Sequence, residues 1–153
     1  MNLPTLNFPT YEFTYKQQAD KTYIFDFIRK KYVLLTPEEW VRQHIVHFLI
    51  KERNYPKTMI AVERGIRVNK RMKRCDIIVY QKNGIPLMIV ECKRSSQKIK
   101  QETFNQVARY NLALKVKYLL VTNGLQHFSC LVHFAQANYT FLDDIPYWET
   151  MNK

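Results

Sequence analysis

CDIIVYQKNGIPLMIVECKR, residues 75–94, contains two apolar runs separated by Asn83-Gly84. Asn-Gly between alternating apolar residues predicts a β-hairpin, because both central residues of a type I′ turn need positive φ. A two-residue turn also fixes the register of the two strands. The predicted cross-strand pairs are Tyr80 with Leu87, Ile78 with Ile89, and Asp76 with Glu91. The stretch therefore predicts two carboxylates that face each other at the rim of a sheet.

A positive charge should lie close to these two carboxylates. Two like charges directly opposite each other destabilise a sheet. Strand alternation puts the positive charge of Lys93 on the same face as Glu91, one step further along the strand. We therefore expect a cation between Asp76 and Glu91. The same register makes Cys75 and Cys92 neighbours on the other face of the sheet. Two reduced core thiols are the favoured interpretation of this pair.

Composition limits the class of protein. A chain of 153 residues with 46% apolar residues predicts one folded domain over 1–153, with an aromatic-rich lead-in at 1–35 and a core at 36–135. The formal net charge of +11 indicates a polyanionic partner. The three glycines cannot form a phosphate-binding P-loop. No signal-peptide pattern or membrane-length apolar run occurs, so we expect a cytoplasmic protein without a membrane partner.

The order of predicted elements indicates the fold class. Thr36-Pro37 with Glu39 predicts a helix start with Thr36 as N-cap, and the helix should end before Asn54. A strand at 59–68, the hairpin strands, a helix at about 99–115 and strands at 117–122 and 128–134 follow. The passage from the third strand through a helix to a new strand is a parallel crossover. We therefore predict an α/β fold with a mixed sheet flanked by helices, in the order helix, three antiparallel strands, helix, strand.

Two motifs resemble a known nuclease superfamily. Asp76 followed by Glu91-x-Lys93 on the next strand resembles the PD-(D/E)XK nucleases, which have a restriction-endonuclease-like core. Gln106 and Tyr110 match the Q-x-x-x-Y signature of RecB-like nucleases, on the helix after the catalytic strand. Residues 23–124 look like the N-terminal nuclease domain of type I restriction enzyme R proteins. The chain departs from these families in two ways: Cys75 stands where the name-giving Pro would be, and the helicase motor of an R protein is absent.

The residues suit metal-dependent hydrolysis of a phosphodiester bond. Carboxylates and water hold a hard divalent cation, which points to Mg²⁺ or Mn²⁺. Lys93 could orient or deprotonate the attacking water, although a surface salt bridge at a strand end is the plain alternative. The resemblance implies a DNA endonuclease of a restriction or repair system. Its implied catalytic residues are Asp76, Glu91, Lys93, Gln106 and Tyr110. Its implied metal ligands are Asp76, Glu91 and the backbone carbonyl of Cys92, with Glu38 on the first helix as an auxiliary ligand.

Basic residues border this predicted site. Residues 64–74 hold six cations and no acid, and they lead directly into Asp76. A charge run is often only a solvated surface, but here no acidic block balances it, so we predict phosphate contacts. The predicted DNA-binding residues are Arg64, Arg67, Lys70, Arg71, Lys73, Arg74, Arg94, Lys98 and Lys100. The four histidines have no partner motif and are interpreted as structural.

Two functions from different classes remain open. The first is a DNA endonuclease domain, alone or with a helicase, translocase or other restriction-system subunit, and double-strand cutting would favour a dimer. The second is a non-catalytic nucleic-acid-binding module with a nuclease fold. The sequence leaves open the recognised site and the preference for double strands, single strands or RNA. It also leaves open the need for a motor and the oligomeric state.

Overall fold

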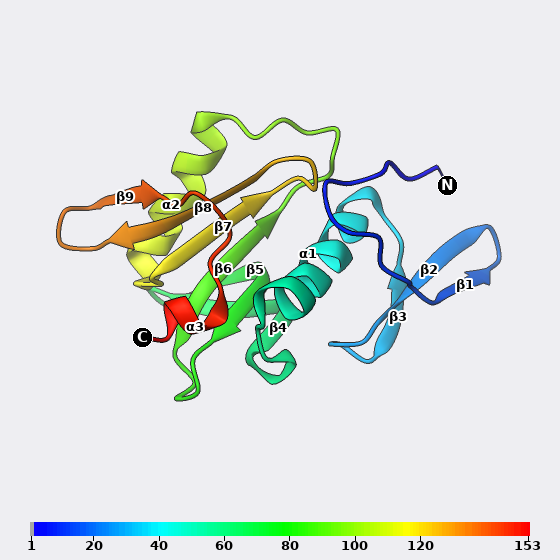
Figure 1. The fold of residues 1–153 in the computed structure, drawn as a ribbon, viewed down its shortest axis with the longest axis horizontal. Helices are drawn as coiled ribbons and strands as arrows, with labels where there is room; N and C mark the ends of the chain where they lie inside the picture. The colour runs from blue at the N-terminus through cyan, green and yellow to red at the C-terminus, as the bar shows by residue number, and fades with distance from the viewer. Residues whose placement is uncertain (1) are drawn as a thin grey trace.

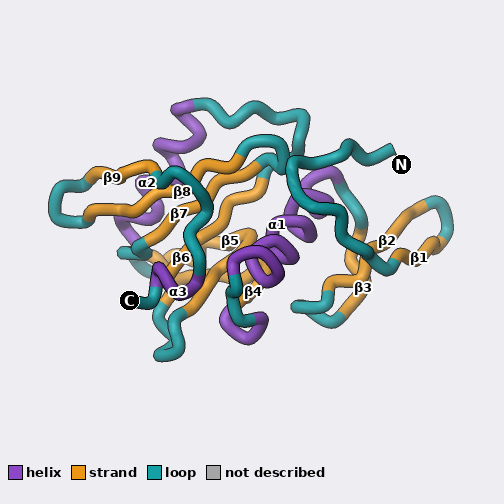
Figure 2. The backbone as a smooth tube through the Cα atoms, in the orientation of Figure 1, coloured by secondary structure: helices purple, strands orange, loops and turns teal. Residues whose placement is uncertain are grey.

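The computed structural model describes residues 2–153, which form one large and one small sheet with three α-helices (Figures 1 and 2). The large sheet has the order β4-β5-β6-β7-β8-β9, and the small one the order β1-β2-β3. The elements in chain order are β1 Tyr15–Gln18, β2 Lys21–Asp26, β3 Lys31–Leu34, α1 Pro37–Arg53, η1 Lys57–Met59, β4 Ile60–Val68, β5 Arg71–Tyr80, β6 Pro86–Cys92, α2 Gln101–Leu114, β7 Tyr118–Thr122, β8 His127–His133, β9 Asn138–Phe141 and α3 Trp148–Met151.

Helix α1 begins and ends where the sequence predicts. The Thr36 hydroxyl oxygen accepts a hydrogen bond from the Glu39 N–H at 3.0 Å, and Pro37 occupies the first helical position. Asn54 ends the helix in the left-handed conformation. The apolar stripe of Val41, Ile45 and Leu49 is buried against the large sheet. Burial of this stripe, rather than helix propensity, holds α1 on the sheet.

The predicted parallel crossover is confirmed. β6 and β7 pair in parallel, with Ile89 opposite Leu119, and α2 connects them. The other neighbouring strands of the large sheet are antiparallel. Phe104 and Ala108 of α2 pack on β7 and β8, whereas α1 and α3 pack on the opposite face. Figure 1 shows α1 and α3 in front of the sheet and α2 behind it. The fold is therefore the predicted mixed sheet flanked by helices.

The hairpin between β5 and β6 forms, but its turn differs from the prediction. The Gly84 N–H donates to the Gln81 carbonyl, and the Gln81 N–H donates to the Ile85 carbonyl, so the loop has three residues and not two. Tyr80 accordingly lies opposite Pro86, not opposite Leu87. A bulge then restores the register, and Ile78 lies opposite Ile89 as predicted. The prediction of a two-residue turn is wrong, and the predicted pairing of Ile78 with Ile89 beyond the bulge is confirmed.

Several elements lie outside the predicted core. Strand β9 and helix α3 were not predicted, and the lead-in forms a separate three-stranded sheet beyond α1 (Figure 1). The segment before this sheet packs aromatic rings on α1, where Phe13 contacts His44 and His47. Both histidines are buried and donate from Nδ1 to backbone carbonyls of their own helix, which agrees with a structural role. Across residues 2–153, no helix has the length and apolar character needed to cross a membrane.

Candidate active site

One pocket brings together four of the five predicted catalytic residues. Glu91 and Lys93, at the end of β6, and Gln106 and Tyr110, one turn apart on α2, line a pocket of about 140 Å³. Gln106 is exposed, and Tyr110 is 40% exposed. The pocket wall also includes Lys73, whose Nζ lies 4.5 Å from the centre of the Tyr110 ring. The two motifs that carry the resemblance thus meet in space across the sheet–helix interface.

Glu91 and Lys93 form an ion pair within the pocket. Lys93 Nζ lies 3.1 Å from Glu91 Oε1, and both side chains are largely covered. Burial raises the pKa of Glu91, and the negative charge of Asp76 raises it further, while Lys93 lowers it. The influence of Asp76 indicates that the two carboxylates are near each other. The folded protein therefore holds Glu91 where an additional positive charge would be favourable.

Asp76 does not share the pocket wall with Glu91. Its Oδ1 accepts from Arg42 Nη2 of α1 at 2.8 Å, and its Oδ2 accepts from the Cys92 N–H at 2.8 Å. The predicted common face fails because alternation breaks in β5. Cys75 packs with Ile78 on the α2 side, whereas Ile77 packs on the α1 side. Asp76 therefore turns toward α1 and lies beside the pocket rather than in it.

The same break occurs in the neighbouring strand β4. Val62 packs on the α1 side and Ile66 on the α2 side, and Glu63 between them has φ of 54°. The pairing of β4 and β5 keeps one register on both sides of this point, with Val62 opposite Ile77 and Arg64 opposite Cys75. A positive φ in a non-glycine strand residue is strained. We call the break of alternation at Glu63 in β4 and at Asp76 in β5 the paired kink. It turns the carboxylates of both residues toward α1.

The predicted neighbourhood of the two cysteines is also wrong. Cys92 lies in the core between the large sheet and α1, and Cys75 lies on the α2 side. The break of alternation between Cys75 and Ile77 is the physical reason. Both thiols are free, and burial raises the pKa of each, that of Cys75 to about 11. They are the reduced core thiols that the sequence favoured.

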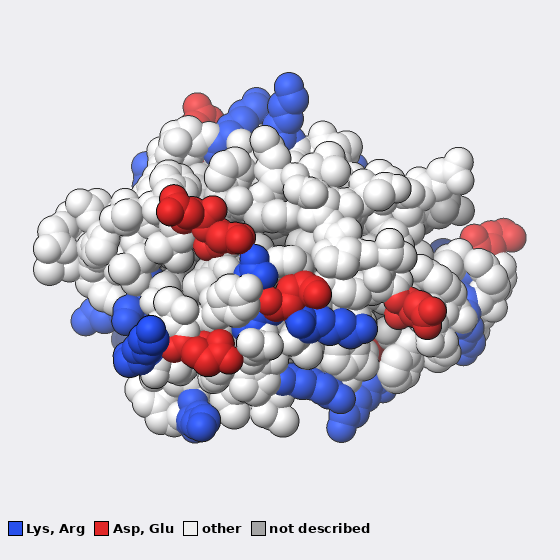
Figure 3. Space-filling view, viewed as in Figure 1, with Lys and Arg blue, Asp and Glu red and all other residues white. Residues whose placement is uncertain are grey.

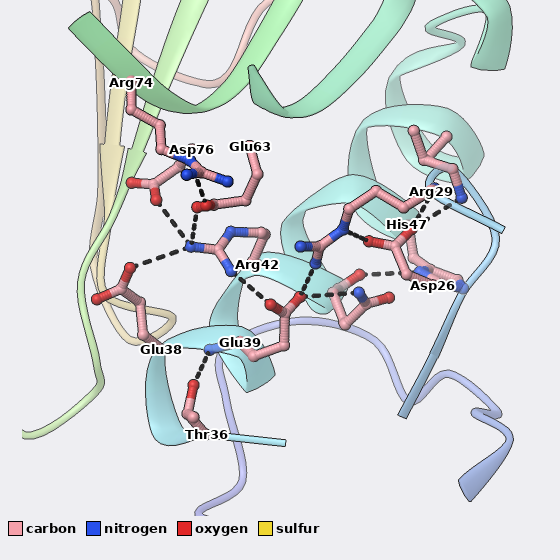
Figure 4. Close-up of polar contacts among 12 residues, drawn as sticks. Asp26, Arg29, Thr36, Glu38, Glu39, Arg42, His47, Glu63, Arg74 and Asp76 are labelled. Carbon is pink, nitrogen blue, oxygen red and sulfur yellow. Dashed lines mark hydrogen bonds and ion pairs between the residues drawn. The ribbon is translucent and has the colours of Figure 1, made fainter. Parts of the chain in front are cut away.

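Arg42 is the residue of the candidate site that sequence reasoning missed. One nitrogen, Nη2, lies 3.1 Å from Glu38 Oε1, 2.9 Å from Glu63 Oε1 and 2.8 Å from Asp76 Oδ1 (Figure 4). Its other terminal nitrogen, Nη1, contacts Glu39. Burial lowers the pKa of Arg42, but Glu39 and Asp76 outweigh burial, and the net shift is upward. Each carboxylate therefore has its own positive partner in the chain: Arg42 contacts Asp76, and Lys93 contacts Glu91.

The two glutamates at the start of α1 have different surroundings from those predicted. Glu39, which the sequence assigned only to the helix start, is buried, and its carboxylate accepts from Arg29, Arg42 and Gln43. The side chain of Glu38 is 47% exposed and reaches Arg42. Burial and then the charge of Asp76 raise the pKa of Glu38. Glu38 therefore contacts the same arginine nitrogen as Asp76 but from the solvent side, and its role as an auxiliary ligand stays a prediction.

Carboxylate donors suited to Mg²⁺ or Mn²⁺ are present, and they do not converge on one point. Glu38, Asp76 and Glu91 are near enough for their charges to affect one another, and carboxylate oxygens are what these ions prefer. Within residues 2–153, however, no group of three or more His, Cys, Asp or Glu side chains is arranged to hold a metal ion. The donor chemistry fits the metal, and Arg42 Nη2 occupies the space between the carboxylates of Glu38, Glu63 and Asp76.

The predicted DNA-binding cations divide between a hairpin and a loop. The hairpin of β4 and β5 turns at Asn69-Lys70, both with positive φ, so the two-residue type I′ turn occurs here. Of its six cations, Arg74 is paired with Glu63, and Lys73 contacts Tyr110. Arg94, Lys98 and Lys100 are exposed on the loop between β6 and α2, at the top in Figure 2.

The basic charge is not gathered on the face that carries α1 and α3. On this face, Figure 3 shows acidic and basic side chains interspersed. The cross-strand pairs divide the hairpin cations between its two faces. Arg64 lies opposite Cys75 and Arg71 opposite Val68, on the pocket side, whereas Arg67 lies opposite Met72 on the other side. Only some of the predicted cations therefore share a surface with the pocket.

A family comparison identifies the family of the chain. The model of the type I restriction enzyme R protein N terminus matches residues 37–146, which is more than half of the chain. The chain belongs to this family. The match contains α1 through β9, and so every residue of the candidate site. The small N-terminal sheet lies outside the matched residues.

A solved structure supports the fold of this R-protein N-terminal domain. The fragment structure described as an HsdR subunit of a type I restriction enzyme from Vibrio vulnificus YJ016 is similar, with a TM-score of 0.55 and 19% sequence identity. The similarity covers 77% of this chain and 25% of that one, so the chain spans about a quarter of the length of the protein it matches. None of the curated proteins compared with the chain matches it.

Proposed function

We propose that this R-protein N-terminal domain is a metal-dependent DNA endonuclease of the PD-(D/E)XK superfamily, in the RecB-like Q-x-x-x-Y subgroup. The observation that carries the proposal is the single pocket formed by Glu91, Lys93, Gln106 and Tyr110. Two motifs that are separate in the sequence meet there, with Asp76 and Glu38 beside them. An isolated ion pair at a strand end would not need a glutamine and a tyrosine from a facing helix. Family membership supports a role in a restriction system.

Each residue has a distinct proposed task. Lys93, held by Glu91 at 3.1 Å, donates a hydrogen bond from Nζ that orients the attacking water. Gln106 and Tyr110, on the opposite wall, contact the DNA backbone or fix the strand in the pocket. Lys73, over the Tyr110 ring, contributes a positive charge to the same wall. These tasks are positioning and charge neutralisation, which phosphoryl chemistry mainly requires.

Asp76, Glu91 and the Cys92 carbonyl are the proposed ligands of the metal, with Glu38 as an auxiliary ligand. When bound, Mg²⁺ or Mn²⁺ supplies an activated water and neutralises charge that develops on the phosphate. The chain itself prepares for this by placing carboxylates in partly buried positions, where burial raises the pKa of Glu91 and of Glu38. The hairpin and loop cations would bind phosphates on either side.

The test is cleavage of plasmid DNA by the purified chain with Mg²⁺ or Mn²⁺, or by the restriction complex into which the chain is assembled. Asp76→Ala, Glu91→Ala and Lys93→Ala should each abolish cleavage. Glu102→Ala and Lys82→Ala, which change exposed residues outside the pocket, are the matched controls and should cleave normally. Full activity in any of the first three variants would contradict the assignment.

A non-catalytic nucleic-acid-binding module is the second candidate. The contact of Asp76 with Arg42 favours it, because an arginine already neutralises a carboxylate that the nuclease needs for metal. In that case the chain should bind DNA equally in EDTA and in Mg²⁺, and neither the chain nor its assembled complex should nick plasmid through these residues. The same cleavage assay therefore separates the two functions.

A further inference from the structure

Arg42 occupies a position that resembles a cation site. Three carboxylate oxygens lie within 3.1 Å of Arg42 Nη2. They come from three different elements: Glu38 of α1, Glu63 of β4 and Asp76 of β5. A terminal guanidinium nitrogen has two N–H groups. The three oxygens therefore exceed its donors, and charge attraction rather than hydrogen bonding holds the third.

The paired kink directs two of these carboxylates toward Arg42. Glu63 has the strained φ of 54°, and its second oxygen is held by Arg74 at 2.8 Å. Asp76 is fixed from its other side by the Cys92 N–H. Two strands thus break their alternation at the same point to reach one buried arginine, only 6% exposed. Strain of this kind persists only where surrounding contacts over-determine it.

We propose that Arg42 is a positioning residue that holds Asp76 in the metal-free protein, and that Asp76 exchanges this guanidinium for the divalent cation. This inference rests on the proposed metal-dependent function. The exchange leaves no buried charge unpaired, because Arg42 keeps Glu39 on its other nitrogen and Glu63 beside it. Asp76 is accordingly the partner that Arg42 can release.

The exchange has a measurable consequence for cation affinity. A positive charge about 5 Å from a divalent ion weakens its binding by about tenfold or more, even at the dielectric constant of water. Removing the guanidinium should therefore tighten cation binding. A purely structural Arg42 predicts the opposite, because loss of the residue that orders the carboxylates would loosen the site.

The experiment is calorimetric titration of the metal-free chain with Ca²⁺, with thermal melts of the same proteins in EDTA and in Ca²⁺. Arg42→Gln should melt below wild type in EDTA, bind Ca²⁺ about tenfold more tightly and show a larger rise in melting temperature. Arg53→Gln is the matched control: it lies on the same helix and is similarly covered, but its partner is Asp144. It should lose stability without any change in Ca²⁺ affinity.

A charge-balanced double variant guards against misfolding. Glu39→Gln with Arg42→Gln removes both members of one buried pair, which costs less than leaving one charge alone. It should also bind Ca²⁺ more tightly than wild type. Unchanged or weaker Ca²⁺ binding in the Arg42 variants, with wild type binding normally, would overturn the exchange alone. Absence of Ca²⁺ binding in every protein would instead overturn the proposed metal-dependent function.

Discussion

The two faces of the β4–β5 hairpin should contribute unequally to DNA binding. Arg64 and Arg71 lie on the side of the pocket, and Arg67 and Lys70 lie on the other side and at the turn. We compare two double variants, Arg64→Gln/Arg71→Gln and Arg67→Gln/Lys70→Gln. Each removes two positive charges. All four residues are exposed, so neither pair should change stability by more than about 0.5 kcal/mol. A difference in DNA affinity would therefore reflect position.

The magnitude follows from counterion release. Each phosphate contact with duplex DNA contributes about 0.9 to the slope of log K against log salt. If Arg64 and Arg71 each contact one phosphate, their loss should reduce the slope by ~1.8. At ~0.1 M salt the affinity should fall by roughly 60-fold, or ~2.5 kcal/mol. The other pair should reduce the slope by less than ~0.9.

The assay is fluorescence anisotropy of a labelled duplex over a series of salt concentrations, in EDTA so that no cleavage occurs. Melting curves of both double variants confirm that they are folded. Equal slope changes for the two pairs would show that the hairpin acts only through net charge. An unchanged slope for both would make the basic hairpin a solvated surface.

Two further expectations concern stability. Glu91→Gln should melt no lower than wild type in EDTA, because burial and Asp76 raise the pKa of Glu91 and so disfavour its charge in the folded state. The variant should lose most of the stabilisation by Ca²⁺. In wild type this stabilisation is ~2.7 kcal/mol when the free Ca²⁺ concentration is about one hundred times Kd. An equal rise in melting temperature for both proteins would exclude Glu91 as a ligand. Burial lowers the pKa of His44, His47 and His127. Their contribution to stability is present above the unfolded-state value near 6.5 and is lost as pH falls below it. Urea unfolding at pH 7 and 5 should show a smaller loss for His127→Gln than for wild type, and an equal loss would refute that contribution.

The parts of the fold that the sequence predicted are those with strong local signals. Thr36 and Pro37 start α1 because a side-chain cap and a fixed φ act within one turn. The crossover from β6 through α2 to β7 follows from element order, since a parallel neighbour requires a long connection. β9 and α3 are only four residues each and have no comparable signal. The small N-terminal sheet was expected only as short strands.

The β5–β6 hairpin shows how a correct register arose from a wrong turn. The predicted two-residue turn lacks one loop residue, and the prediction also lacked the bulge at Leu87. Each omission shifts the pairing by one residue, in opposite directions, so they cancel at Ile78 and Ile89. The Asn-Gly signal reported the presence of a turn but not its length. Asn69-Lys70, a weaker sequence signal, forms the two-residue turn instead.

The charged network was partly within reach of the sequence. Glu38 and Glu39 precede Arg42 by four and three residues, the spacings at which helical side chains meet. This spacing could have identified Arg42 as the partner of both. Nothing local could have identified Glu63, because a glutamate in a strand gives no sign of a positive φ. Its role depends on Arg42 and Arg74, which come from other elements.

The failure of alternation at Asp76 is informative about function. In a regular sheet, Asp76 would have lain on the face of Glu91, and two buried carboxylates would have repelled each other without a protein cation between them. The paired kink turns Asp76 to Arg42 and leaves Glu91 to Lys93, so each acid has its own positive partner. Asp76 remains near enough to raise the pKa of Glu91. The chain thus keeps two acids close while stabilising them separately, an arrangement that a single added cation could convert into a shared site. A sequence rule that assumes strict alternation fails at this point because Arg42, the partner of Asp76, comes from a different element, 34 residues away in the chain.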